Sequence, residues 1–312
     1  MIINKIILLL FILYLSPVSS QEYKTLEGHR GNVNSISYSP DSKFIASADE
    51  NGVIIFWEAE SYTRIYSLET TSNVTCVNYS TDGYFAYTTY DGYVTIMKAN
   101  NREIVQNFRK DGNCYYVSYS GSGKKFALAY VKEASKDERE KGLSKIFYLD
   151  IYGVPGYEKI KTLKLTKPGD SDGSLFGSKL FETYRADFFN CEFSTSGDYI
   201  ASGNLGKSIP IYSFEYSKFV PPYKGHSEKV NFVTFSQDGK FLASAGKDET
   251  IKIWDIISAK SIKTLKGHTN EVNFASFSPD SRYLASAGND ETVKIWDVKT
   301  TNLIVTLSCC KF

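Results

Sequence analysis

Residues 223–255 read YKGHSEKVNFVTFSQDGKFLASAGKDETIKIWD, and residues 265–297 repeat the pattern 42 residues later as LKGHTNEVNFASFSPDSRYLASAGNDETVKIWD. An earlier copy carries His29, Ser47 and Trp57. In all three copies the histidine precedes a serine by 18 residues, an aspartate or asparagine by 22 and a tryptophan by 28. A fixed period of this size indicates similar structural units that pack side by side.

Each unit contains short β-rich runs separated by turn-forming residues. In one copy the runs are Val230–Phe235, Phe241–Ser244 and Thr250–Trp254, and Gly and Asp recur between them. A fourth run, Ser261–Leu265, follows before the next copy begins. Each unit therefore predicts four strands.

The dipeptides Gly225-His226 and Trp254-Asp255, which open and close a copy, resemble those of the WD-repeat β-propeller family. The resemblance covers nearly all of the chain after residue 20. It implies an all-β fold, a single propeller of four-stranded blades. It also implies a non-catalytic platform for protein–protein recognition.

Three weaker copies, which begin near Val74, Cys114 and Phe188, lack the Gly-His dipeptide. They place Met97, Phe147 or a near neighbour, and Tyr212 at the tryptophan position. Six blades are therefore predicted, with seven as the alternative, although residues 109–182 are too few for two units of about 42 residues. The six units span about 26–67, 68–108, 109–165, 183–222, 223–264 and 265–308 within a domain of residues 21–312.

Propellers usually close by pairing a terminal strand with the last blade, which removes an exposed edge. Two strands could do this here. Tyr23–Glu27 precedes the first unit, and Leu303–Leu307 follows the last Trp-Asp dipeptide. The sequence leaves both alternatives open.

Residues 1–20 resemble a secretory signal peptide. Lys5 precedes the apolar run Ile6–Leu15, and small residues before Gln21 suit cleavage. The run is about half the length of a membrane-spanning helix, so no stable membrane insertion is expected after signal removal. The prediction is a secreted or secretory-pathway protein. The alternative is a cytoplasmic scaffold or adaptor subunit of a multiprotein complex, whose N-terminal run is an anchor or a gene-model artefact.

The composition excludes several classes of function. The 312 residues include 36 Lys plus Arg and 35 Asp plus Glu, and no concentrated basic patch predicts nucleic-acid binding. The disulfide state of Cys76, Cys114, Cys191, Cys309 and Cys310 stays open. They form no CxxC pair and lie in no His cluster, so no metal site is expected. No cofactor or catalytic motif is found either. A second alternative, an enzyme that uses the central opening of the ring, would need a convergent acid–base pair.

The resemblance implies that each histidine joins a buried hydrogen-bond chain with an aspartate, a serine and the tryptophan. In the first copy Asn51 takes the place of the aspartate, which keeps the acceptor and loses the charge. The implied chain residues are His29, Ser47, Asn51 and Trp57; His226, Ser244, Asp248 and Trp254; and His268, Ser286, Asp290 and Trp296.

The family also implies a binding face, formed by the turns between second and third strands and by the starts of the inner strands. Asn, Tyr and paired charges there suit a hydrated protein interface. The candidates on this face are Asn32, Asn34, Tyr90, Asn113, Tyr115, Lys229, Asn231, Lys247, Glu271 and Asn273. The expected partners are other proteins or peptides.

Two insertions lengthen loops of the same face. Lys132–Gly142 is highly charged, whereas Thr166–Tyr184 carries Phe176 and Phe181, apolar residues that a plain linker does not need. Phe176 and Phe181 complete the set of candidate partner-binding residues.

Overall fold

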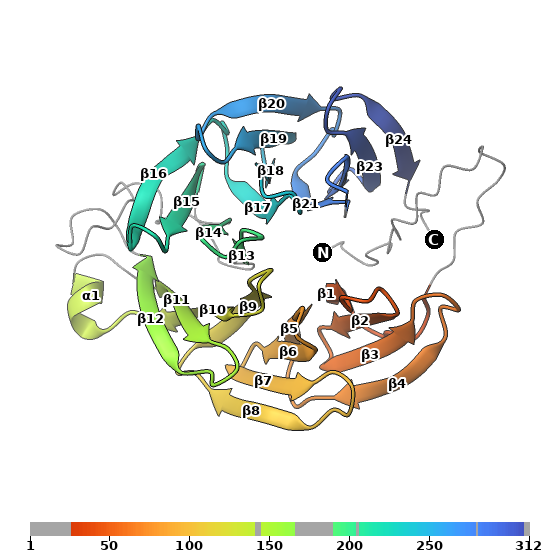
Figure 1. The fold of residues 1–312 in the computed structure, drawn as a ribbon, viewed down its shortest axis with the longest axis vertical. Coiled ribbons are helices and arrows are strands. Elements are labelled where there is room, and N and C mark those ends of the chain that lie inside the picture. Colours follow the sequence, from red (N-terminus) through yellow and green to blue (C-terminus); the bar gives the residue numbers. More distant parts are fainter. Residues whose placement is uncertain (1–25, 141–144, 166–189, 204–205, 279, 309–312) are drawn as a thin grey trace.

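The computed structural model describes residues 26–140, 145–165, 190–203, 206–278 and 280–308. Within these residues, 24 strands form six antiparallel sheets of four strands each, and one short helix lies outside the sheets. The sheets stand as blades around a ring, with the first strand of each blade innermost (Figure 1). The prediction of an all-β, six-bladed propeller is confirmed.

Each blade consists of four strands that are consecutive in the chain. Blade one contains β1 (Val33–Tyr38), β2 (Phe44–Asp49), β3 (Val53–Glu58) and β4 (Arg64–Glu69). Blade two contains β5 (Val74–Tyr79), β6 (Tyr84–Thr89), β7 (Tyr93–Lys98) and β8 (Ile104–Arg109). Blade three contains β9 (Asn113–Tyr119), β10 (Lys125–Glu133), β11 (Lys145–Gly153) and β12 (Lys159–Leu165), with helix α1 (Lys136–Glu140) between β10 and β11.

The remaining blades follow in the same order. Blade four contains β13 (Cys191–Phe193), β14 (Tyr199–Ser202), β15 (Ser208–Ser213) and β16 (Lys218–Lys224). Blade five contains β17 (Val230–Phe235), β18 (Phe241–Gly246), β19 (Thr250–Asp255) and β20 (Ser261–Lys266). Blade six contains β21 (Val272–Phe277), β22 (Tyr283–Gly288), β23 (Thr292–Asp297) and β24 (Leu303–Ser308).

Turn chemistry explains why the strands end where they do. After β17, the Ser236 hydroxyl donates to the Asp238 carboxylate at 2.7 Å and accepts the backbone N–H of Phe241 at 2.9 Å. Gly239 in this turn has a φ of 70°, a left-handed conformation that glycine adopts without strain. The turn therefore reverses the chain directly into β18.

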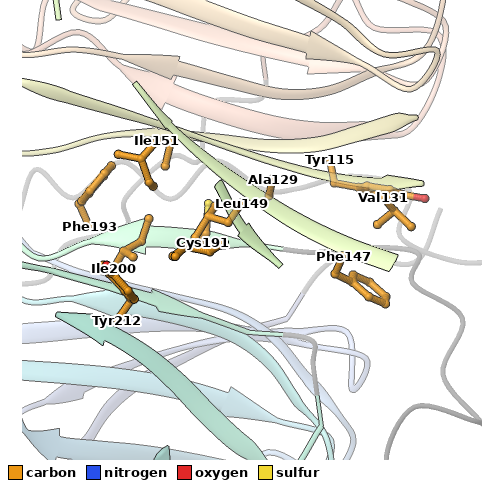
Figure 2. Close-up of a cluster of buried hydrophobic side chains, with 12 residues drawn as sticks. Tyr115, Ala129, Val131, Phe147, Leu149, Ile151, Cys191, Phe193, Ile200 and Tyr212 are labelled. Atoms are coloured by element: carbon orange, nitrogen blue, oxygen red, sulfur yellow. The ribbon is translucent and has the colours of Figure 1, made fainter. Parts of the chain in front are cut away.

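The hydrophobic core lies between neighbouring blades. Figure 2 shows the cluster between blades three and four, where Leu149 and Ile151 pack with Cys191 and Ile200. Because a blade that lies between two neighbours buries both faces, its strands carry apolar residues on both sides, and its middle strands are buried almost throughout, as in blades two and five.

The strand register identifies the residue at each tryptophan position. Leu242 pairs with Trp254 in blade five, and the corresponding pairs set Met97 and Tyr212 at that position in blades two and four. In blade three the corresponding partner of Phe126 is Tyr152, five residues beyond Phe147, so the prediction of Phe147 or a near neighbour was wrong. The strands β10 and β11 have nine residues each, and this longer hairpin shifts the register away from Phe147.

Strand β24 completes blade six, so Leu303–Leu307 takes the outer position that the sequence analysis left open. Leu26 and Glu27 form no strand, and Tyr23–Thr25 lie outside the described residues.

Several other predictions fall wholly or partly outside the described residues. These are the signal-like residues 1–20, the insertion Thr166–Tyr184 with Phe176 and Phe181, and the pair Cys309 and Cys310. Of the other cysteines, Cys76, Cys114 and Cys191 are buried free thiols. Burial raises the pKa of the Cys76 thiol to about 11, so it stays protonated at neutral pH. None of the described helical residues forms a segment with the length and hydrophobicity needed to cross a bilayer.

Candidate binding face

A hydrogen-bond chain runs through blade five from the tryptophan to the aspartate. The Trp254 indole N–H donates to the Ser244 hydroxyl oxygen at 2.8 Å, and this oxygen lies 2.7 Å from His226 Nε2. His226 Nδ1 lies 2.9 Å from both carboxylate oxygens of Asp248. A carboxylate only accepts, so His226 Nδ1 carries a proton and donates it to Asp248.

Blade six repeats this chain. The Trp296 indole N–H donates to the Ser286 hydroxyl oxygen at 2.8 Å. The same distance separates that oxygen from His268 Nε2, and His268 Nδ1 from the Asp290 carboxylate. Burial lowers the pKa of His268, although the Asp290 carboxylate opposes this effect, so the ring favours its neutral form.

The chain joins two loops on one face of the ring. Asp248 lies in the turn between β18 and β19, and its carboxylate also accepts the backbone N–H of Ser227, in the loop before β17, and that of Thr250, the first residue of β19. Burial alone would raise the pKa of Asp248, but hydrogen bonds from His226 and Thr250 hold it below its usual range. These histidines are therefore structural groups with no free ring nitrogen.

In blade one the acceptor is Asp49, and the assignment of Asn51 was wrong. His29 Nδ1 lies 2.8 Å from the Asp49 carboxylate, and His29 Nε2 lies 2.6 Å from Ser47. Asp49 pairs with Val33 as Gly246 pairs with Val230, so the two residues occupy equivalent positions.

A Cβ added at Gly246 would lie 2.5 Å from His226 Nδ1. This position therefore points at the histidine, and in blade one an aspartate fills it. The Asn51 side chain instead approaches Gly31, where an added Cβ would meet its amide nitrogen at 2.6 Å.

Blade three has a buried ion pair that the sequence analysis missed. Lys110 lies four residues before Cys114, as His226 lies four residues before Val230. Its ammonium lies 2.7 Å from the fully buried Asp150 carboxylate, which also accepts the Thr162 hydroxyl at 2.5 Å. The four-residue spacing was the signal that could have identified Lys110.

We call the side of the ring that carries the second-to-third-strand turns and the loops between blades the turn face. Several predicted binding residues on it hold neighbouring blades together. The Asn34 amide donates to the Val74 carbonyl, and the Asn231 amide to the Val272 carbonyl, each at 3.0 Å across a blade boundary. These two asparagines therefore link neighbouring blades, and we call them inter-blade staples.

Other candidates are paired within the turn face. Asn32 donates to Glu50 and Asn273 to Asn289, while Lys247 forms a 2.8 Å ion pair with Glu271 of the next blade. The Tyr115 ring is buried and meets Tyr90 edge-on at 5.9 Å between centroids. Asn113 and Lys229 are half-buried. Few side chains of the candidate partner-binding residues are therefore exposed, and Tyr90 and Lys247 are two of these.

The described part of the charged insertion forms the end of β10 and helix α1. The Ser135 N–H donates to the Glu138 carboxylate at 2.9 Å, and Glu138 forms a 2.6 Å ion pair with Lys164 of β12. The hydrogen bond from Lys164 lowers the pKa of Glu138 to about 2. This part of the insertion is thereby fixed to the outer strand of blade three (Figure 1).

A family model described as "WD domain, G-beta repeat" matches residues 20–58, 62–96, 217–255 and 259–297. These segments correspond to blades one, two, five and six. Strands β9–β15 of blades three and four, where the sequence departs from the repeat, fall outside the matches, whereas β16 of blade four lies within the third match.

Curated relatives match over part of their length. The chain is 36% identical over 99 residues to the small ribosomal subunit protein RACK1 of Glycine max. This match covers 32% of this chain and 30% of the relative. The RACK1 protein of Candida albicans is 37% identical over 112 residues, or 33% of this chain and 35% of the relative. The cross-pathway control WD-repeat protein 2 of Flammulina velutipes is 31% identical over 106 residues, or 31% of this chain and 34% of the relative. The chain thus matches about a third of the length of these proteins.

Proposed function

Since this chain is a WD-repeat β-propeller protein, we propose that it is a non-catalytic scaffold that binds other proteins inside the cell through its turn face. The observation that carries the proposal is the rigid construction of that face. In blades one, five and six, a hydrogen-bond chain fixes the loop before the inner strand to the turn between the second and third strands. A preorganised surface loses little conformational entropy when a partner binds.

The chemistry of the described residues supports a binding role over a catalytic one. All three histidines of the chain have both ring nitrogens engaged in structural hydrogen bonds. The exposed Tyr90 offers an aromatic anchor, and Lys247 with Glu271 offers a polar rim.

The relatives favour the intracellular alternative over secretion. Two of those described above are named as proteins of the small ribosomal subunit, which works inside the cell. Cleavage before Gln21 stays a prediction, and N-terminal sequencing of the protein from fractionated cells tests it directly.

Affinity capture followed by mass spectrometry tests the binding face. We expect the double variant Tyr90→Ala/Lys247→Glu to lose most of the main partner because it removes one anchor and reverses one rim charge. Tyr216→Ala is the control for loss of an exposed tyrosine, since Tyr216 is 57% exposed against 45% for Tyr90 but lies in the β15–β16 turn on the opposite face. Unchanged capture by the folded double variant would remove these residues from the site.

A third variant tests the remaining candidates, Phe176 and Phe181. Replacing residues 166–181 with a Gly-Ser linker should weaken capture and leave the unfolding midpoint unchanged if these side chains bind the partner. A large fall in the midpoint would instead assign them to the core.

A further inference from the structure

Hydrophobic clusters join consecutive blades along the chain, but none in the described residues joins blade six to blade one. Five clusters each combine side chains from two neighbouring blades. The sixth draws its buried members, Ile45, Ile55, Trp57 and Ala59, from blade one alone. We call the two sheet faces that meet no neighbour, one on blade one and one on blade six, the seam; Figure 1 places it between β1–β4 and β21–β24.

Identical sequences show that the blade-six face is uncovered. Strands β18 and β22 both contain Leu-Ala-Ser-Ala-Gly. Ala243 and Ala245 of β18 are 0% exposed beneath blade six, whereas the equivalent Ala285 and Ala287 are only partly buried. The exposure of these two alanines follows from the missing neighbour, since their own sheet has the same register.

On the blade-one side the inner strand is incompletely covered. Val33, Ile36 and Tyr38 of β1 are all partly exposed. The equivalent residues of β17, which lie against blade four, are Val230, Val233 and Phe235, at 1%, 0% and 4% exposure.

Among the described residues, the asparagine bond that crosses other blade boundaries is also missing at the seam. Asn34 and Asn231 each donate to the first carbonyl of the next inner strand. The equivalent asparagine in blade six, Asn273, donates to Asn289 of its own blade at 2.6 Å.

A buried hydroxyl on the blade-one side lacks a hydrogen-bond partner among the described residues. Tyr38 Oη is shielded from solvent and makes no hydrogen bond within the described residues. At the corresponding position of blade three, the Tyr119 hydroxyl lies 3.2 Å from that of Tyr157. An orphaned buried hydroxyl costs free energy, so a covering segment that offers a backbone carbonyl would satisfy it.

The chain itself carries a suitable segment next to this face. Leu26, where the described chain begins, packs against the blade-one cluster on the seam side. The preceding 25 residues include the apolar run Ile6–Leu15, which contains no charged residue. Ten extended residues reach about 33 Å, longer than a six-residue strand, and the ten residues between Leu15 and Leu26 leave ample length to return.

We propose that Ile6–Leu15 packs into the seam and covers the apolar faces of blades one and six. A whole blade needs about 40 residues, so this segment supplies a partial filling of the gap rather than a seventh blade. The proposal requires that the run be retained in the mature chain, as the intracellular placement above also implies. It differs from ring closure at the outer edge of the last blade, because β24 already occupies that edge.

Hydrogen exchange with mass spectrometry tests the proposal on the full chain expressed in the cytosol. The variant replaces Ile6–Leu15 with ten Gly and Ser residues and so keeps the length. We expect exchange in peptides from β1 and β22 to be about tenfold faster in the variant, while β18, whose equivalent face lies under blade six, is unchanged.

Equal exchange in the two proteins would overturn the proposal. Slow exchange in both would mean that blades one and six meet directly, and fast exchange in both would leave the seam to an external partner. Protection accompanied by a dimeric mass in light scattering would assign the seam to a second copy of the chain.

A second measurement does not depend on the variant's folding. A photo-crosslinking residue at Leu10 of the full chain should crosslink within the same molecule to blade one or blade six, and crosslinks elsewhere would contradict the proposal. Recovery of the native protein with Gln21 at its N-terminus would overturn both this inference and the intracellular placement. A retained run without protection of β1 and β22 would overturn this inference alone.

Discussion

Asp49 and Asn51 lie two residues apart in the chain, but it is the Asp49 carboxylate that accepts the hydrogen bond from His29 Nδ1. Asp49 also accepts the backbone N–H groups of Asn51 and Val53. We expect Asp49→Ala to lower the free energy of unfolding by about 1–3 kcal/mol, because buried donors would lose their acceptor. Asn51→Ala, at an exposed side chain, is the matched control and should change it little. Equal losses in chemical denaturation would contradict the assignment of Asp49.

The pKa of His268 predicts a pH dependence of stability. Burial lowers this pKa in the folded state below the usual value of 6.5, so on acidification the unfolded chain takes up the proton first. The contribution of the neutral ring is therefore complete above about pH 6.5 and is lost as the pH falls below it. We expect the unfolding midpoint of the wild type to fall between about pH 7.5 and 5.5, and that of His268→Gln to fall less. Parallel pH profiles would count against a neutral buried ring.

At the scale of a single blade, the Lys110–Asp150 pair replaces the histidine chain. Asp150 is fully buried, and the Lys110 ammonium also lies within 5.3 Å of the Tyr130 and Tyr152 ring centroids. Lys110→Met should lower the free energy of unfolding by about 3–5 kcal/mol, because it leaves a buried carboxylate without its partner. Calorimetry of blade-three variants measures the effect.

The control for this prediction is an exposed pair of the same type. Lys98 and Glu103 form a 2.8 Å ion pair in blade two with both side chains in solvent, and Lys98→Met should leave the unfolding midpoint nearly unchanged. If Lys110→Met were equally harmless, the buried pair would contribute nothing to blade three.

The repeat pattern predicts what a blade contains better than which side chain performs each role. The 42-residue period locates the four strands of blades five and six, because turn residues and apolar alternation recur at fixed spacing. The histidine chains of these blades were predicted from the family resemblance, not from the period. The period misplaces Phe147, because the longer β10–β11 hairpin changes the register. It also misses Lys110, since a lysine–aspartate pair has no place in the family pattern.

At the scale of the whole ring, the sequence could not separate inter-blade staples from binding residues. Asn34 and Asn231 lie on the predicted face, and their side chains bond to the next blade. That distinction depends on how neighbouring blades approach each other, which no single repeat encodes. For the same reason, the count of six units does not predict the seam. The repeat sequences of blades one and six resemble those of blades that have a neighbour on both sides.

The asymmetry of the ring makes one further prediction with an internal control. Asn231 and Asn273 occupy equivalent positions in blades five and six, but Asn231 crosses a closed boundary and Asn273 stays within its blade at the seam. Asn231→Ala should lower the free energy of unfolding by about 1–2 kcal/mol, because the Val272 carbonyl loses its donor at a packed interface. Asn273→Ala should cost clearly less, because its partner Asn289 is exposed and can bond to water instead. Chemical denaturation of both variants measures the difference, and equal costs would mean that blade six is held to blade one as tightly as blade five is held to blade six.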